Sequence, residues 1–94
     1  MTTSIAFHDS IYAQGYGVIK GDSIVSETIT ESGSSQQSAA ATKPFVTVVS
    51  TVAIWVAIGS NPTATTASSR QLQTAGVPFT YGVSAGHKVA VVTA

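Results

Sequence analysis

The sequence predicts an all-β protein, either a small antiparallel β-sandwich or a jelly-roll-like barrel of seven to eight short strands. No long stretch keeps apolar side chains at the i, i+3, i+4, i+7 spacing of an amphipathic helix, and leucine occurs once, at Leu72. Valine, isoleucine and threonine are abundant, and their β-branched side chains suit a pleated sheet. Turn residues divide the chain into segments spaced by about 8 to 12 residues, which is typical of sandwiches and barrels.

The composition indicates one compact domain whose surface is covered by neutral hydroxyl groups. The chain has 94 residues, four Lys+Arg against four Asp+Glu, and 9% charged residues, where about 25% is usual. Serine and threonine supply 26 residues, and the hydrophobic content of 44% is enough for a core. A domain this small buries little apolar surface, and zero net charge removes the repulsion that keeps soluble monomers apart. We therefore expect the chain to form homo-oligomers.

The residue balance argues against several functional classes. The four cationic residues are scattered, so no basic run predicts nucleic-acid binding. The longest apolar run, residues 52–58, is much shorter than the roughly 20 residues of a membrane-spanning helix. Residues 1–5 lack the basic and apolar regions of a secretory signal, so none is expected. Cysteine is absent, which excludes disulfides and thiolate metal sites, and no cofactor is expected.

Residues 1–14 are expected to form an N-terminal arm or an edge strand, ahead of a single β-sandwich domain over residues 15–94. The segment begins with weak apolar alternation at Ile5 and Phe7. An arm would add a strand to a neighbouring subunit through backbone pairing, with Ile5, Phe7 and Tyr12 as its contacts.

A β-hairpin is predicted next, with residues 16–20 and 23–30 as its two arms. The connection is Gly21-Asp22, whose glycine tolerates the positive φ that primed hairpin turns require.

The second arm of this hairpin carries two carboxylates. Val25 and Ile29 alternate in phase with Glu27 and Glu31, so the pattern leaves open which face is buried. A separation of four residues on a strand places the carboxylates about 13 Å apart, too far for a glycosidase pair. We expect them to act as gatekeepers that keep an edge strand from pairing with other chains.

The middle of the chain is predicted to hold a polar loop, a small-residue segment and two strands. Residues 32–37 have loop composition, and the small side chains of residues 38–42 permit close backbone approach. A strand is expected at 45–50, followed by 52–58, which is apolar on both faces and fits a central strand covered on both sides. One face would belong to the core, and the face with Trp55 would meet a loop or a neighbouring subunit.

The C-terminal half alternates turns, a loop and short strands. Residues 59–62 are expected to end the central strand, and 63–69 to form a hydroxyl-rich loop. Turns are predicted at Ala75-Gly76 and at residues 84–87. The strands expected between and after them are 70–73, the alternating segment 79–83, and 88–93.

One turn matches a catalytic pattern. Residues 82–86 fit the G-x-S-x-G sequence of hydrolase nucleophile elbows around Ser84, and His87 follows. An elbow requires a helix after the serine, with acid and base from a much larger sheet, whereas a strand follows here. A plain β-turn is therefore preferred, and the chain is not expected to be an enzyme. His8 and His87 are the only histidines and lack short metal-ligand spacing, so no metal site is expected.

The aromatic side chains have two interpretations. Anchors of the core or of a subunit interface are favoured over a sugar-stacking platform, because Phe79 and Tyr81 alternate on an apolar face and Trp55 lies in an apolar run. A glycan-binding surface is the alternative, with Tyr12 and Tyr16 as its solvent-facing candidates. The residues expected in the core or the subunit interface are Val52, Ile54, Trp55, Val56, Phe79, Tyr81, Val89 and Val91.

From about residue 34 onward the sequence resembles small virion proteins of tailed bacteriophages. The motifs are the segment SQQSAA at 35–40, a β-hairpin over 46–58, the loop GSNPTAT at 59–65 and the closing strand AGHKVAVV at 85–92. The resemblance covers roughly two thirds of the chain.

This resemblance implies a β-sandwich in the virion, assembled in the host cytoplasm. The expected function is that of a capsid decoration or cement protein, a homotrimer that clamps neighbouring subunits of the major capsid protein. Such a protein stabilises the shell by mass action over many copies. A tail or fibre accessory protein, or a carbohydrate-binding virion module for host attachment, is the alternative. The resemblance carries over no catalytic residue.

Overall fold

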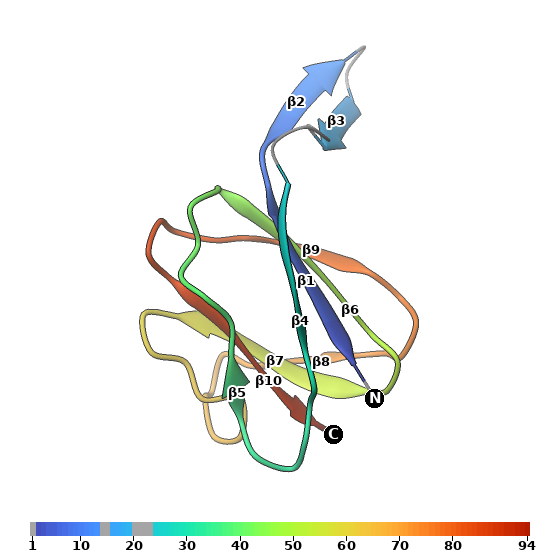
Figure 1. Cartoon of the computed structure of the whole chain (residues 1–94), viewed down its shortest axis with the longest axis vertical. Coiled ribbons are helices and arrows are strands. Elements are labelled where there is room, and N and C mark those ends of the chain that lie inside the picture. The colour runs from blue at the N-terminus through green and yellow to red at the C-terminus, as the bar shows by residue number, and fades with distance from the viewer. Residues whose placement is uncertain (1, 14–15, 20–23) are drawn as a thin grey trace.

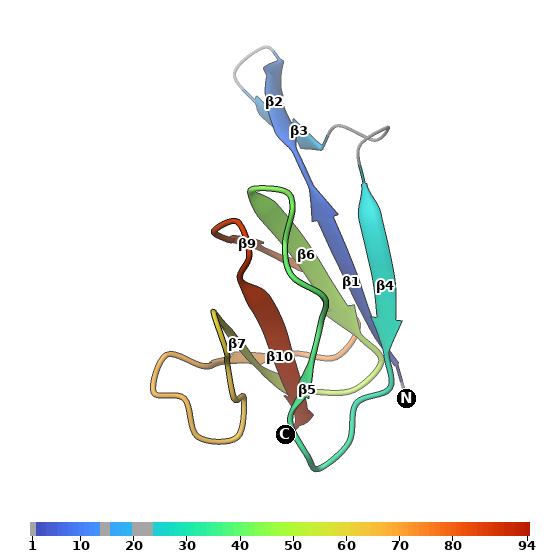
Figure 2. The same ribbon diagram turned by 60° about the vertical axis from the view of Figure 1, so that its left-hand side comes forward.

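The computed structural model describes residues 2–13, 16–19 and 24–94, with the backbone alone for 10–13 and 16–19. These residues contain strands and no helix, and every strand pair is antiparallel. Eight strands form two four-stranded sheets, which face each other as the layers of a sandwich (Figure 2). The predicted small antiparallel β-sandwich is confirmed.

The first sheet has the strand order β4-β1-β6-β9 (Figure 1). Strand β1 pairs with β4 on one side and with β6 on the other, so it lies inside the sheet. The expected arm or edge strand within residues 1–14 is therefore wrong for β1. Its alternating side chains Thr3, Ile5 and Phe7 are buried against the second sheet, which anchors the strand in the domain. The strands are β1 (Thr3–His8), β4 (Val25–Ile29), β6 (Phe45–Ser50) and β9 (Phe79–Gly82).

The second sheet has the strand order β5-β10-β7-β8. The hairpin expected over residues 46–58 does not form, because β6 belongs to the first sheet and β7 to the second. Both strands carry apolar side chains on alternate positions, and the chain crosses between the layers so that these side chains meet across the core. The strands are β5 (Gln36–Gln37), β7 (Ile54–Gly59), β8 (Gln71–Gln73) and β10 (Lys88–Thr93).

Two further strands, β2 (Ser10–Ala13) and β3 (Tyr16–Ile19), form a hairpin that projects beyond the sandwich (Figure 1). The hairpin predicted from residues 16–20 and 23–30 is wrong in its pairing. Strand β3 pairs with β2, while β4 pairs with β1 over the whole register from Val25 to Ile29. The Gly21-Asp22 connection lies outside the described residues.

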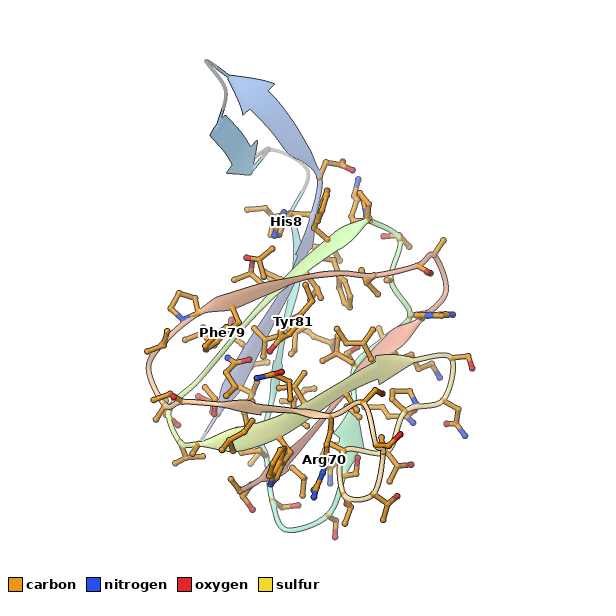
Figure 3. The ribbon with its side chains drawn as sticks, turned by 180° about the vertical axis from the view of Figure 1, so that it is seen from behind. His8, Arg70, Phe79 and Tyr81 are labelled. Carbon is orange, nitrogen blue, oxygen red and sulfur yellow. The ribbon has the colours of Figure 1, made fainter. Side chains whose placement is uncertain are left out.

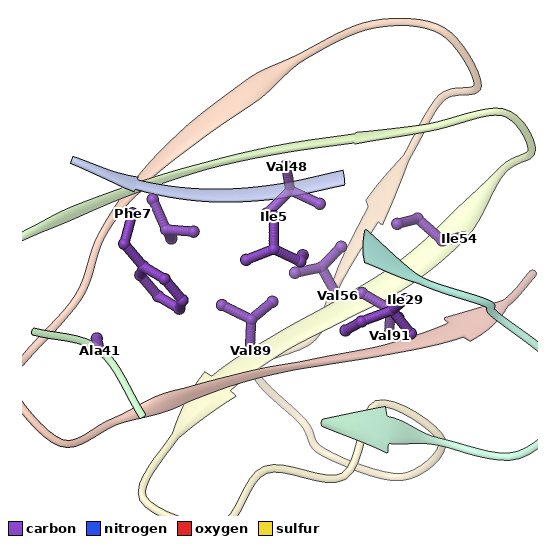
Figure 4. Packing of buried hydrophobic residues seen from close by; sticks show 10 residues of the cluster. Ile5, Phe7, Ile29, Ala41, Val48, Ile54, Val56, Val89 and Val91 are labelled. Carbon is purple, nitrogen blue, oxygen red and sulfur yellow. The ribbon is translucent and has the colours of Figure 1, made fainter. Parts of the chain in front are cut away.

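The main core fills the space between the two sheets. In Figure 4, Ile5, Phe7 and Val48 point from the first sheet toward the second. Ile5 and Phe7 are therefore core residues and not arm contacts, and the Tyr12 side chain lies outside the described part. Four residues expected in the core or interface are buried here: Ile54, Val56, Val89 and Val91.

A second cluster covers the outer face of the second sheet. Ala57, Ala90 and Val92 pack there beneath Ala64 of the loop over residues 60–70, with Trp55 half-buried beside them. The Arg70 guanidinium lies 4.1 Å from the centroid of the Trp55 ring. Strand β7 is apolar on both faces and is covered on both, with the loop over its outer face. Of the two expectations for the face with Trp55, a loop or a neighbouring subunit, the loop is the one observed.

Gln73 joins the two sheets on the side of β8 and β9. Its buried Nε2 donates to the backbone oxygen of Val48 at 2.6 Å and to that of Val77 at 3.3 Å, and its Oε1 accepts from the Tyr81 hydroxyl at 3.1 Å. Burial raises the pKa of the Tyr81 hydroxyl above its usual value of 10.0. One polar side chain thus connects β8 of the second sheet with β6 and β9 of the first.

Candidate functional site

The serine motif forms a β-turn, as predicted. His87 donates its backbone N–H to the Ser84 carbonyl at 3.0 Å, and Gly86 between them adopts a φ of 83°. The Ser84 side chain is exposed. Among the described residues, the one hydrogen bond between these two residues is this backbone contact.

His8 serves the packing of the first sheet. It is 1% exposed, with its ring 6.1 Å from that of Phe45 and nearly parallel to it. His8 Nε2 lies 2.8 Å from Thr47 Oγ1, which is 2.9 Å from the Thr80 hydroxyl. This chain of polar contacts crosses β1, β6 and β9. No group of three or more potential metal ligands occurs among the residues that the structure describes.

The two carboxylates of the 23–31 segment face the interior. The buried Glu31 carboxylate accepts a hydrogen bond of 2.7 Å from the Thr3 hydroxyl through one oxygen. Its other oxygen, also buried, has no partner within the described ranges. Ser50 Oγ lies 3.2 Å from the Thr3 hydroxyl, which has a single proton to donate. Neither carboxylate is the free edge charge that was expected, because Glu31 lies beyond the end of β4, and Glu27, half-buried on that edge strand, bonds through Oε1 to the Ala39 backbone.

A groove lies beside β4, at the border between the two sheets. The small-residue segment 38–42 follows β10 closely, with backbone hydrogen bonds of 2.7 Å from Ser38 to Val89 and from Ala41 to His87. On its other side, the Ala39 backbone donates to Glu27 Oε1 at 2.8 Å. Between this segment and β4 opens a pocket of about 150 Å³, lined by Phe7, Val25, Ser26, Glu27, Ala39 and Ala40.

The opposite side of the sandwich, formed by the edge strands β8 and β9, is uncharged and exposes large apolar side chains. Phe79 is 37% exposed and Val77 beside it is 45% exposed. From residue 44 to residue 87 the chain has a single charged residue, Arg70, which is held against Trp55 and the backbone oxygens of residues 64 and 65. Edge strands usually carry charges that prevent pairing with other chains. The β8–β9 edge lacks this protection.

The structure separates the aromatic residues that the sequence grouped together. Trp55 lies under the loop, and Tyr81 bonds to Gln73. Phe79 is left exposed at the sheet edge (Figure 3). The side chains of Tyr12 and Tyr16 lie outside the described residues. The groove beside β4 has no signal in the sequence, because it depends on the pairing of β4 with β1. The long uncharged stretch was the available signal for the open β8–β9 edge.

Comparisons with protein-family models, with curated proteins and with solved structures found no match to this chain. Within the described ranges, no helix is long and apolar enough to span a membrane. The arrangement of the two edges therefore carries the functional argument.

Proposed function

We propose that this chain is a structural module of a bacteriophage particle, a decoration or cement protein that binds the lattice of the major capsid protein and associates with copies of itself. The observation that carries the proposal is the β8–β9 edge, where exposed apolar side chains occur without any charge to repel another chain. The resemblance of residues 34–92 to small virion proteins supports the same assignment. A head position is favoured over a tail or fibre position by that resemblance.

The rest of the molecule suits a protein that acts by contact. The buried core and the hydrogen bonds of Gln73 fix the two sheets relative to each other, so little conformational freedom is lost when the surface binds. A protein that binds the assembled shell and not its free subunits stabilises the shell by RT ln(1 + [L]/Kd) at each site. Many weak sites on one lattice therefore produce a large total effect.

The test is the stability of virus-like shells made from the major capsid protein of the same genome. Shells are heated with and without the purified chain, and bound copies are counted after sedimentation. We expect saturable binding and a higher dissociation temperature. Val77→Lys should reduce both effects because it adds a charge to the apolar edge, whereas Ser68→Lys, in the exposed loop, adds the same charge elsewhere and should not. A wild-type chain that stays in the supernatant contradicts the proposal, and binding to tails alone assigns it to the tail.

A further inference from the structure

We infer that copies of this chain associate head to tail, with Phe79 of one copy inserted into the pocket beside β4 of the next. The inference deepens the proposed function and rests on it, since it identifies the surfaces through which the module would join its own copies. It depends on the size of the pocket, on the position of Phe79 and on the direction of the strands.

The pocket has the size and the lining for one phenyl ring. Its volume is about 150 Å³, and Phe7, Val25, Ala39 and Ala40 give it mainly apolar walls. An engineered apolar cavity of about 150 Å³ in another protein stays dry and binds benzene. Two polar residues, Ser26 and Glu27, also line the pocket, and Glu27 Oε1 accepts a hydrogen bond of 2.8 Å from the Ala39 backbone N–H. An apolar side chain can therefore enter without displacing this hydrogen bond.

Within the described part of the molecule, Phe79 is the aromatic residue exposed enough to contact another copy. Five large apolar side chains are exposed there, and Phe79 is the aromatic one among them. It cannot reach the pocket of its own chain. Strands β4 and β9 are the two edges of the same sheet, and three strand spacings of about 4.8 Å place them about 14 Å apart. Insertion therefore requires a second copy.

The side chains on the two edges also point to the same face of the sheet. Val25 pairs with Phe7, and Phe79 pairs with Val48. Directly opposed residues in antiparallel strands share a face, and both Phe7 and Val48 are buried in the core. Val25 and Phe79 thus lie on the inner face at opposite ends of the sheet. When β9 of a second copy lies beside β4, its Phe79 is therefore on the side of the sheet where the pocket opens.

Strand direction allows the sheet to continue from copy to copy. All three pairings in the order β4-β1-β6-β9 are antiparallel, so β4 and β9 run in opposite directions. A second copy in the same orientation places its β9 antiparallel to β4 of the first. Because different surfaces meet, the contact is heterologous, and rotation about an axis along the strands closes it into a ring. The homotrimer expected from the resemblance is one such ring.

In a ring, each copy makes two contacts, one through Phe79 and one through the pocket beside β4, and the surface of one chain has room for both. A standard interface covers about 800 Å² on each partner. Two contacts of this size would take up about a third of the 5163 Å² of accessible surface. Ile24 and Val25 on one edge, and Val77 on the other, supply exposed apolar area around the pocket and around Phe79.

The test is sedimentation velocity of two complementary variants of the full chain. Phe79→Ser removes the inserted ring and keeps the pocket, while Val25→Asp places a carboxylate in the pocket wall and keeps the ring. Both side chains are exposed, 37% and 51%, so both variants should fold, as circular dichroism can verify. Each alone should associate about 30-fold more weakly than wild type, a change that corresponds to about 2 kcal/mol. The control Leu72→Ser removes a side chain that is 50% exposed on the outer face of the second sheet, opposite Trp55 and away from the inner face that carries Phe79, and it should associate like wild type.

Mixing the variants distinguishes a head-to-tail contact from a symmetric one. An equimolar mixture of Phe79→Ser and Val25→Asp retains one intact contact, between the ring of the second variant and the pocket of the first. We expect a complex of two chains that grows no further. The inference is overturned if wild type is monomeric at millimolar concentration, if both variants associate like wild type, or if the mixture forms no complex. A wild type that binds shells but shows one of these results keeps the proposed function and loses only this contact.

Discussion

Replacement of Gln73 by leucine tests whether a single polar side chain holds the two sheets together. The substitution keeps a side chain of similar size and removes three hydrogen bonds, two donated by Nε2 to backbone oxygens and one accepted from Tyr81. At about 1 kcal/mol each, these bonds contribute about 3 kcal/mol. Loss of the Gln73 donor at the buried Val48 backbone oxygen adds about 1 kcal/mol to the loss, and apolar burial of leucine returns about as much. The free energy of unfolding should therefore fall by about 3 kcal/mol.

Urea unfolding measured by circular dichroism gives this quantity directly. For a slope of about 1 to 1.5 kcal/mol per molar urea, the midpoint should fall by about 2 to 3 M. Gln71→Leu, at a solvent-exposed position two residues earlier on the same strand, is the control and should change stability by no more than about 0.5 kcal/mol. Tyr81→Phe should cost about 1 kcal/mol in the wild type and almost nothing beside Gln73→Leu, because its partner is already gone. A Gln73→Leu protein as stable as the Gln71→Leu control would refute this account of how the sheets are joined.

Three further predictions concern the buried hydroxyl, a turn glycine and the phenol. Thr3→Val should lower the free energy of unfolding by about 3 kcal/mol in urea titrations, because it removes the donor to the buried Glu31 carboxylate, and an unchanged midpoint would contradict this role. Gly86 has a φ of 83°, so Gly86→Ala should lower the free energy of unfolding by about 1 to 2 kcal/mol. Gly82→Ala, with open space around its Cβ position and no positive φ, should lower it less. Equal melting temperatures of the two variants would contradict the turn geometry. Burial raises the pKa of Tyr81 in the folded state, so the contribution of its phenol to stability is complete below pH 10 and is lost as pH rises through the folded pKa. Above pH 10 the wild type should therefore lose more stability than Tyr81→Phe. Parallel plots of unfolding free energy against pH for the two proteins would exclude the effect.

The periodicity of single segments predicted the fold class and much of the local structure. Residues 52–58 have apolar side chains on both faces, and the structure covers one face by the core and the other by the 60–70 loop. The turn at Ser84 also follows from its local residue types. Strand pairing was harder to predict, because the pairing of β4 depends on contacts with residues that are distant in the sequence. Its partner, β1, is separated from it by the β2–β3 hairpin.

The candidate surfaces were predictable only in part for the same reason. The pocket requires Phe7, Val25 and Ala40 to meet, and no spacing in the sequence connects those positions. The exposure of Phe79 depends on β9 being the last strand of its sheet, although its alternation with Tyr81 is the same as that of a buried residue. The absence of charge around β8 and β9 was visible in the sequence and becomes meaningful once both strands are known to be edges.

A count of its copies in purified particles is the decisive test of whether this chain is a stoichiometric part of a particle. Quantitative mass spectrometry of purified particles gives the molar ratio of this chain to the major capsid protein. For a structural module of the particle we expect a fixed ratio that survives repeated washing and is the same in independent preparations. Particles that lack the chain, or that hold it at a variable trace level, would contradict the claim.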